Sequence, residues 1–171
     1  MRGRAAEAQR SPSYSCTMKT FSSLLEGPGT PGEQQAAARE QLRSMLAQSK
    51  LRYWSPSMAF SLQGERILIG VATWSVFDLN LLDCLQGALS RGRQTVIDVF
   101  DADDCKALDD FEPYIPSIGR VFQSPAVGIW RDGESVLSAW GFAGRRLLKE
   151  IGLVHQSFER DVEQRLQRTR Q

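Results

Sequence analysis

The sequence predicts an α/β fold with a mixed central sheet. Two apolar segments of strand length, 67–73 and 95–100, flank a segment with a helical repeat of leucines, 79–89. This order is typical of a β-α-β unit, in which the two strands are parallel and the crossover is right-handed. Further along, Asp132-Gly133 gives a hairpin signal, which adds a pair of antiparallel strands.

Size and charge restrict the class of protein. The chain has 171 residues, of which 42% are hydrophobic and 24% charged, which is enough for one core with extensions. The net charge of +1 gives no overall field that would attract nucleic acid or an anionic membrane. No apolar segment is long enough for a membrane span, and the N-terminus lacks the apolar region of a secretory signal. We therefore expect a cytoplasmic protein without nucleic-acid or membrane partners.

The composition divides the chain into three parts. Residues 1–29 have scattered Arg, Ser, Pro and Gly without a period, which indicates a flexible leader in which a few apolar residues could dock locally. The domain is expected at 30–152, and an amphipathic C-terminal helix at 153–171. Translation could start at Met1 or at Met18.

The first helix of the domain has a clear start signal. Thr30 is expected as the N-cap, with Glu33 completing a capping box, and the helix is expected to end near Lys50. It is followed by apolar residues that alternate with small ones over 58–62, which predicts a half-exposed strand.

A short turn follows the central apolar strand, and it is where a functional site is expected. It consists of Trp74, Ser75, Val76, Phe77 and Asp78. This turn resembles the Trp-Cys-x-x-Cys turn of thioredoxins, with Ser75 and Asp78 in place of the two cysteines. The spacing also allows a second capping box, in which the Ser75 oxygen accepts from the third helical N–H and Asp78 accepts from the Ser75 N–H.

A second loop strengthens the resemblance to thioredoxins. Ser124-Pro125 precedes the strand-like segment 127–131, as in the thioredoxin loop that carries a cis proline, and the offsets to the hairpin and to Gly141 also match. The resemblance covers residues 66–151. It implies a three-layer α/β/α fold with a mixed central sheet, an N-terminal helix and a C-terminal helical extension. The matching residues are Ala72, Trp74, Pro125, Gly133 and Gly141.

The departures from the thioredoxin pattern predict a site without redox activity. Both thiols are missing, and the carboxylate that thioredoxins bury five residues before the tryptophan corresponds to Ile69. We therefore expect a non-catalytic adaptor that binds a protein or peptide through the turn 74–78 and through Ser124 and Pro125, with no cofactor and no metal. The same surface could also be a relic without a ligand.

An enzyme is the alternative. Cys84 or Cys105 could act as a reactive thiol, or Ser75 could anchor glutathione, as in transferases of the same superfamily. The three cysteines, of which the third is Cys16, have no C-x-x-C spacing, and free thiols are favoured over a Cys84–Cys105 disulfide. Cys84 is expected to pack in the core. The single histidine, His155, is distant in sequence, so that no triad is predicted.

Two charged regions have ordinary interpretations. The acidic residues between 101 and 112 do not follow the spacing of a calcium loop, and we expect a solvated loop there. Beyond 151, apolar residues recur at helical spacing among charged ones, which predicts a helix packed on its own domain or, alternatively, one that binds a partner. These apolar residues are Val154, Phe158, Val162 and Leu166.

Overall fold

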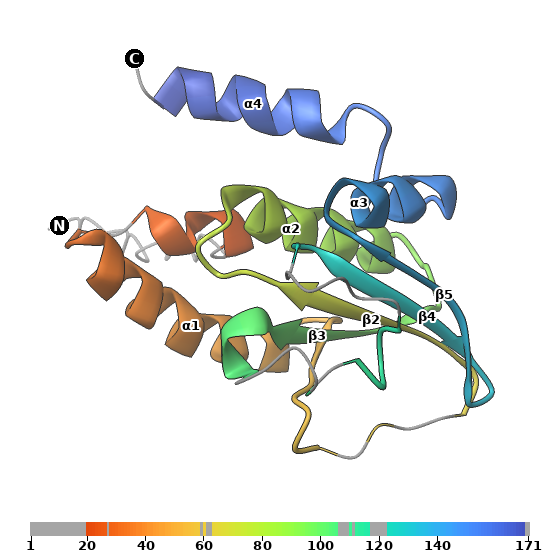
Figure 1. Ribbon diagram of the computed structural model, residues 1–171. Helices are drawn as coiled ribbons and strands as arrows, with labels where there is room; N and C mark the ends of the chain where they lie inside the picture. The colour runs from red at the N-terminus through yellow and green to blue at the C-terminus, as the bar shows by residue number, and fades with distance from the viewer. Residues whose placement is uncertain are drawn as a thin grey trace, which may run out of the picture.

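The computed structural model describes residues 20–26, 28–58, 60, 63–105, 110, 112–116 and 123–169. Its helices and strands follow one another along the chain as shown in Figure 1. The elements are η1 (Phe21–Leu25), α1 (Pro31–Ala47), β1 (Arg52–Tyr53), β2 (Glu65–Val71), α2 (Val76–Ser90), β3 (Val96–Asp101), η2 (Ala102–Asp104), β4 (Ala126–Arg131), β5 (Glu134–Trp140), α3 (Gly141–Glu150) and α4 (Phe158–Thr169).

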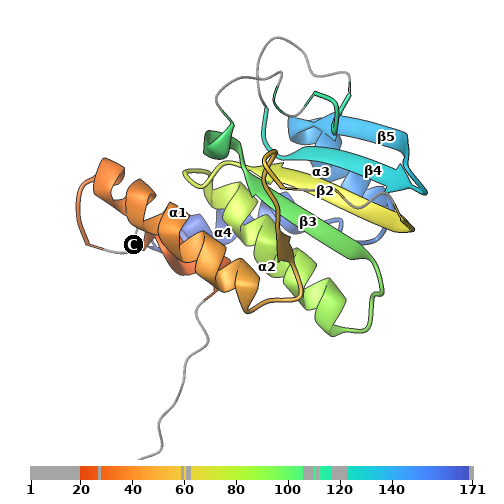
Figure 2. The ribbon, with the colours of Figure 1, turned by 90° about the horizontal axis from the view of Figure 1, so that it is seen from below.

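The five strands form one mixed sheet, which confirms the predicted fold class. Their order is β1-β3-β2-β4-β5, and Figure 2 shows the sheet from below. β1, β3 and β2 are parallel, whereas β4 is antiparallel to β2 and β5 is antiparallel to β4. Asp132 and Gly133 join β4 to β5 with φ angles of 49° and 89°, as a two-residue hairpin turn requires. The chain has a thioredoxin-like fold.

One face of the sheet packs against helices. α2 and α3 lie over it, and α4 lies over α2 on the side away from the sheet (Figure 1). The odd-numbered residues of β2 point to this face, which holds the larger apolar core. Phe158 and Val162 of α4 are buried in that core, so the C-terminal helix packs on its own domain as predicted.

The opposite face is covered by irregular segments instead of helices in the described residues. Figure 1 shows the chain after β1 and the segment 112–116 on that side. They carry aromatic rings that meet edge to face, such as Trp54 and Tyr114 with centroids 4.6 Å apart. Phe100 of β3 and Phe60 join the same cluster. The predicted three-layer arrangement has helices on both faces of the sheet. Among the described residues, irregular segments with aromatic side chains form the layer on this second face.

This aromatic cluster explains why the strand predicted at 58–62 is wrong. Of its described residues, Met58 lies in a bend and Phe60 in irregular chain. The edge strand is instead β1, where Arg52 and Tyr53 pair with β3. Phe60 lies outside the strands, and its ring packs against the rings of Trp54, Tyr114 and Trp130. These partners come from separate parts of the chain.

Part of the predicted leader belongs to the core. Phe21 and Leu24 of η1 are buried, and η1 packs against both α1 and α2. The Asp83 carboxylate on α2 accepts from the backbone N–H groups of Phe21 and Ser22, at 2.7 and 3.0 Å. The sequence analysis expected a flexible leader here, but Phe21–Leu25 form η1 and pack on the domain. The Asp83 side chain of α2 satisfies the first N–H groups of η1 and so holds it in place.

The acidic residues after β3 are not simply solvated. The buried Asp101 accepts from Nε of Arg39 at 3.0 Å, and Asp104 accepts from Nη2 of Arg39 at 3.0 Å and from Arg43 at 2.5 Å. Both arginines lie on α1, so these acids hold α1 at the end of β3.

Among the described helices, none combines the length and the apolar character that crossing a membrane requires.

Candidate functional site

Three segments meet at one end of the sheet. β2 ends there and leads into the turn before α2, and β4 begins there after Pro125. β5 ends at the same edge and leads into α3, because β4 and β5 are antiparallel. The Gly141 N–H donates to the Pro125 carbonyl at 2.9 Å, which ties the start of α3 to the loop before β4. The peptide bond between Ser124 and Pro125 is cis.

Ser75 caps α2 as expected, but Asp78 takes a different position from the one predicted. The Ser75 Oγ accepts from the Asp78 N–H at 3.3 Å. The Asp78 carboxylate does not reach back to Ser75; it accepts from the Ala72 N–H at 2.9 Å. The Ser75 N–H donates to the Ala72 carbonyl instead. The carboxylate thus closes the turn from the inside, and half of the expected capping box is wrong.

Asp78 is a buried acid with one unpaired oxygen. Its exposed fraction is 1%, and Oδ1 has no hydrogen-bond partner among the described residues. Burial raises the pKa of Asp78, and the Ala72 N–H, the nearby Ser124 hydroxyl and the Arg145 charge lower it only in part. Position 69, where the sequence analysis noted the missing acid, is a buried isoleucine, but a buried acid lies elsewhere in the site. The acid is present at position 78, where thioredoxins have their second cysteine.

We expect the Asp78→Asn variant to gain stability over the wild type as the pH rises from acid to neutral. The raised pKa means that the unfolded chain loses its proton first as pH increases. Stability from Asp78 is thus fully present below its ordinary pKa of 3.8 and falls as pH rises toward the folded pKa. The asparagine variant lacks this loss and keeps an oxygen for the Ala72 N–H.

Urea unfolding of both proteins between pH 4 and pH 7 measures this difference. The gain in unfolding free energy of Asp78→Asn over wild type should increase with pH and then level off. A difference that is constant or that shrinks with increasing pH would show that the carboxyl ionises as readily in the fold as in the unfolded chain.

Two large aromatic side chains stand out of the surface at this end of the sheet. Trp74 in the turn is 60% exposed, and Phe142 in the first turn of α3 is 66% exposed. They are the two most exposed of the large hydrophobic residues that the structure describes. Because exposed aromatic area is costly in water, such residues often mark a contact surface.

The remaining predicted site residues are less exposed than these two rings. Val76, Phe77 and Ser124 are half-buried, whereas Pro125 is buried. The Arg145 guanidinium lies over the Phe77 ring at 5.7 Å from its centroid. The predicted residues therefore lie on connected elements at one end of the sheet, with Trp74 the one that is most exposed.

The sequence analysis did not identify Phe142, although its position follows from Gly141 and Gly144. A Cβ at Gly144 would lie 2.7 Å from the Pro125 carbonyl oxygen, so a glycine lets α3 approach this loop closely. Gly141 has a φ of 52°, which turns the chain from β5 into α3. The signal that could have identified Phe142 is an aromatic residue directly after the glycine that begins the helix behind the hairpin.

The structure also places the candidate thiols. Cys84 and Cys105 are free and half-buried, and Cys84 packs against the larger core as predicted. His155 lies next to Cys84, with Sγ and Nε2 3.7 Å apart, a contact that the sequence analysis did not predict. The packing of the α4 end of the chain on α2 brings these distant positions together. Cys16 lies outside the described residues.

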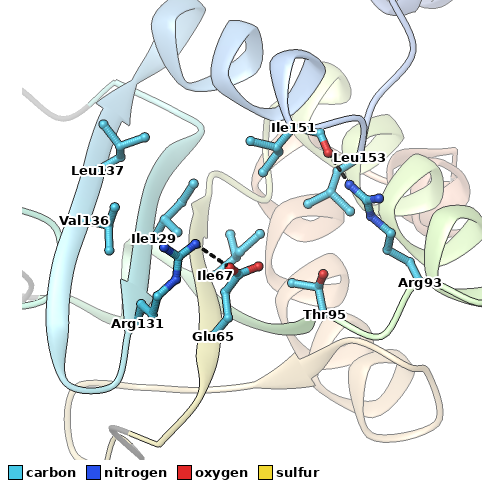
Figure 3. Close-up of a pocket in the computed structure, with 10 residues that line it drawn as sticks. All are labelled: Glu65, Ile67, Arg93, Thr95, Ile129, Arg131, Val136, Leu137, Ile151 and Leu153. Atoms are coloured by element: carbon cyan, nitrogen blue, oxygen red, sulfur yellow. Dashed lines mark hydrogen bonds and ion pairs between the residues drawn. The ribbon is translucent and has the colours of Figure 1, made fainter.

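A pocket of about 160 Å³ lies near the opposite end of the same face of the sheet (Figure 3). Its charged side chains are already engaged, since Arg131 pairs with Glu65 at 2.9 Å and Arg93 donates to the Ile151 carbonyl. None of the predicted site residues lines it. In the part of the chain that the structure describes, no three acidic, histidine or cysteine side chains are grouped as metal ligands.

Solved structures that are similar to this chain include human ERp44 and ERdj5. Human ERp44 aligns with a TM-score of 0.43 and 16% identity over 60% of this chain and 28% of that chain. ERdj5 aligns with a TM-score of 0.42 and 17% identity over 67% of this chain and 15% of that chain. The chain therefore spans less than a third of either structure. No family model and no curated protein matches the chain.

Proposed function

We propose that the chain is a thioredoxin-like domain whose turn 74–78 is redox-inactive and which binds an extended segment of a protein partner. The binding surface consists of the turn 74–78, Ser124, Pro125 and Phe142. The observation that carries this proposal is the exposure of Trp74 and Phe142 on two segments that flank Pro125. This surface is called the aromatic end below.

The side chains in the turn support binding without redox chemistry. A thiolate must attack a disulfide sulfur in thiol–disulfide exchange, and a hydroxyl and a carboxylate do not perform that step. Ser75 and Asp78 are also occupied, because the first caps α2 and the second accepts from the Ala72 N–H. The free thiols Cys84 and Cys105 fit a reducing compartment, and we infer a cytoplasmic location from them.

The backbone and the rings supply two different parts of the recognition. The ladder between β2 and β4 begins at Gly70 and Ala126, which leaves the backbone of Ser124 outside it. An extended partner can pair with this backbone, and such main-chain pairing contributes affinity for many sequences. The rings of Trp74 and Phe142 then select for apolar side chains in the partner.

Replacing the exposed rings is expected to weaken peptide binding strongly. The full chain is applied to an array of random extended peptides, and the dissociation constants of the best binders are measured in solution. Truncating an aromatic anchor costs about 2 kcal/mol, so Trp74→Ala and Phe142→Ser should each weaken binding by about thirtyfold. Folding is not expected to change, because both side chains are mostly exposed.

Leu137→Ser is the matched control. Leu137 is 51% exposed on β5, but it lines the pocket near the opposite end of the sheet. Its replacement removes a similar exposed apolar group and should leave binding unchanged. Equal loss in all three variants, or none in Trp74→Ala and Phe142→Ser, would rule out the aromatic end as the binding surface.

A further inference from the structure

A nucleophile and a base meet on the side of α2 that faces the C-terminal helix. Cys84 lies in the middle of α2, and its Sγ is 3.7 Å from Nε2 of His155. His155 is the only histidine of the chain. It stands in the segment that leads into α4, and the ring of Phe158 packs edge to face against it at 6.1 Å between centroids.

The other nitrogen of the imidazole has partners that fix its orientation. Nδ1 of His155 lies 3.1 Å from the Ser157 hydroxyl and 3.5 Å from the Asp161 carboxylate. The Ser157 hydroxyl in turn donates to that carboxylate at 2.9 Å. A proton on Nδ1 is thereby favoured, which leaves the lone pair of Nε2 directed at the thiol. This is the order of nucleophile, base and orienting acid in thiol enzymes.

The electrostatic surroundings make the base necessary. Burial raises the pKa of the Cys84 thiol; Arg165 and Arg91 lower it, while Asp83 and Asp161 raise it. On balance the thiol holds its proton unless a neighbour accepts it, and His155 is in place to do so. Arg165 donates to the Asn80 amide oxygen from α4, so a guanidinium also lies on this side of α2.

The other described thiol provides a natural comparison. Burial and the carboxylates of Asp110, Asp104 and Asp101 raise the pKa of Cys105 to about 12. Cys105 is half-buried like Cys84, but its charged surroundings are acidic and the one histidine lies elsewhere. The two thiols therefore differ in the presence of a base and in the charge of their surroundings.

We propose that Cys84, His155 and Asp161 form a nucleophilic site that exchanges with small organic disulfides. The Cys84 sulfur attacks one sulfur of the disulfide R–S–S–R, while Nε2 of His155 takes the thiol proton. A bond forms between Cys84 Sγ and S–R, the original S–S bond breaks, and the proton passes to the leaving R–S⁻. The products are a mixed disulfide on Cys84 and one R–SH.

This site is separate from the aromatic end. Cys84 lies nine residues after the cap residue Ser75, which corresponds to about 14 Å along the helix axis. It carries one thiol and forms a mixed disulfide, whereas catalytic disulfide reduction as in thioredoxins requires a resolving thiol next to the first. Loss of peptide binding and loss of thiol reactivity are therefore independent results.

The test measures the rate at which each cysteine reacts with 5,5′-dithiobis(2-nitrobenzoate) in the folded full chain. Cys16→Ser serves as the background, and peptide mapping by mass spectrometry assigns the label. Cys84 should react at least about tenfold faster than Cys105 at neutral pH, because a positioned base accelerates such a step by tenfold or more. The Cys84 rate should also rise less steeply with pH than the Cys105 rate, because the neighbouring base takes the thiol proton.

Variants separate a role in proton transfer from a role in packing. In His155→Gln the Cys84 rate should drop about tenfold and should rise about tenfold per pH unit, as for an unassisted thiol. Asp161→Asn should slow the reaction severalfold, and Glu163→Gln, an exposed residue on the same helix with the same change of charge, should not. Circular dichroism melting verifies that each variant is folded. Equal rates at Cys84 and Cys105, or an unchanged rate and pH profile in His155→Gln, would overturn the proposal.

Discussion

Replacing Asp98 with alanine is expected to lower the free energy of unfolding by about 3–5 kcal/mol. Asp98 lies on β3 with an exposed fraction of 1%, and its Oδ2 accepts from Nε and Nη2 of Arg66 at 3.0 and 2.7 Å. Arg66 on β2 is itself 5% exposed. Without the carboxylate the buried guanidinium loses two hydrogen bonds to an opposite charge, which is costly in a medium of low polarity.

Urea unfolding at pH 7 measures this loss, and a surface pair is the control. Arg131 pairs with Glu65 at 2.9 Å, but both side chains are about half exposed or more. Glu65→Gln should therefore cost less than about 1 kcal/mol. If Asp98→Ala also cost less than about 1 kcal/mol, the buried pair would not stabilise this sheet.

Replacing Gly70 with alanine is the second change with a large expected effect. A Cβ at this position in β2 would lie 2.3 Å from Cζ of Phe100, because the ring lies against the glycine backbone. The ring cannot move freely, since it packs edge to face on Trp54 at 5.8 Å between centroids. Overpacking of this kind costs about 1–3 kcal/mol, and the short approach places the expected loss near the upper end of that range.

Gly32→Ala is a control for the loss of a glycine. Gly32 lies in the first turn of α1, and a Cβ there would meet no atom within 4 Å. This variant should be as stable as the wild type or more stable by up to about 1 kcal/mol. A double variant, Gly70→Ala with Phe100→Leu, should recover part of the lost stability if the ring is the obstacle. Equal effects of Gly70→Ala and Gly32→Ala would contradict the close approach.

The parts of the fold that depend on neighbours in sequence could be predicted. The capping box of Thr30 and Glu33 is present as expected, because both partners lie within one helical turn. Ser75 likewise caps α2, and the hairpin at Asp132 and Gly133 joins the expected strands. In each case the chemistry of two or three adjacent residues determines the local backbone.

The features that depend on distant neighbours could not be predicted. Asp78 turns inward because the Ala72 N–H competes with that of Ser75, a choice that the spacing alone leaves open. His155 reaches Cys84 only because the α4 end of the chain packs on α2. Phe60 looks like a strand residue in sequence, yet its partners are aromatic rings from other segments.

Nuclear magnetic resonance of the ¹⁵N-labelled chain tests the aromatic end most directly. The strongest peptide from the array is titrated into the full chain, and the backbone and indole N–H signals are followed. The Trp74 indole and the amides of Ser75 and Phe142 should shift together and saturate, while those of Leu137 and Arg93 should not change. Shifts confined to the region of the pocket near Leu137 and Arg93, with Trp74 unaffected, would contradict peptide binding at the aromatic end.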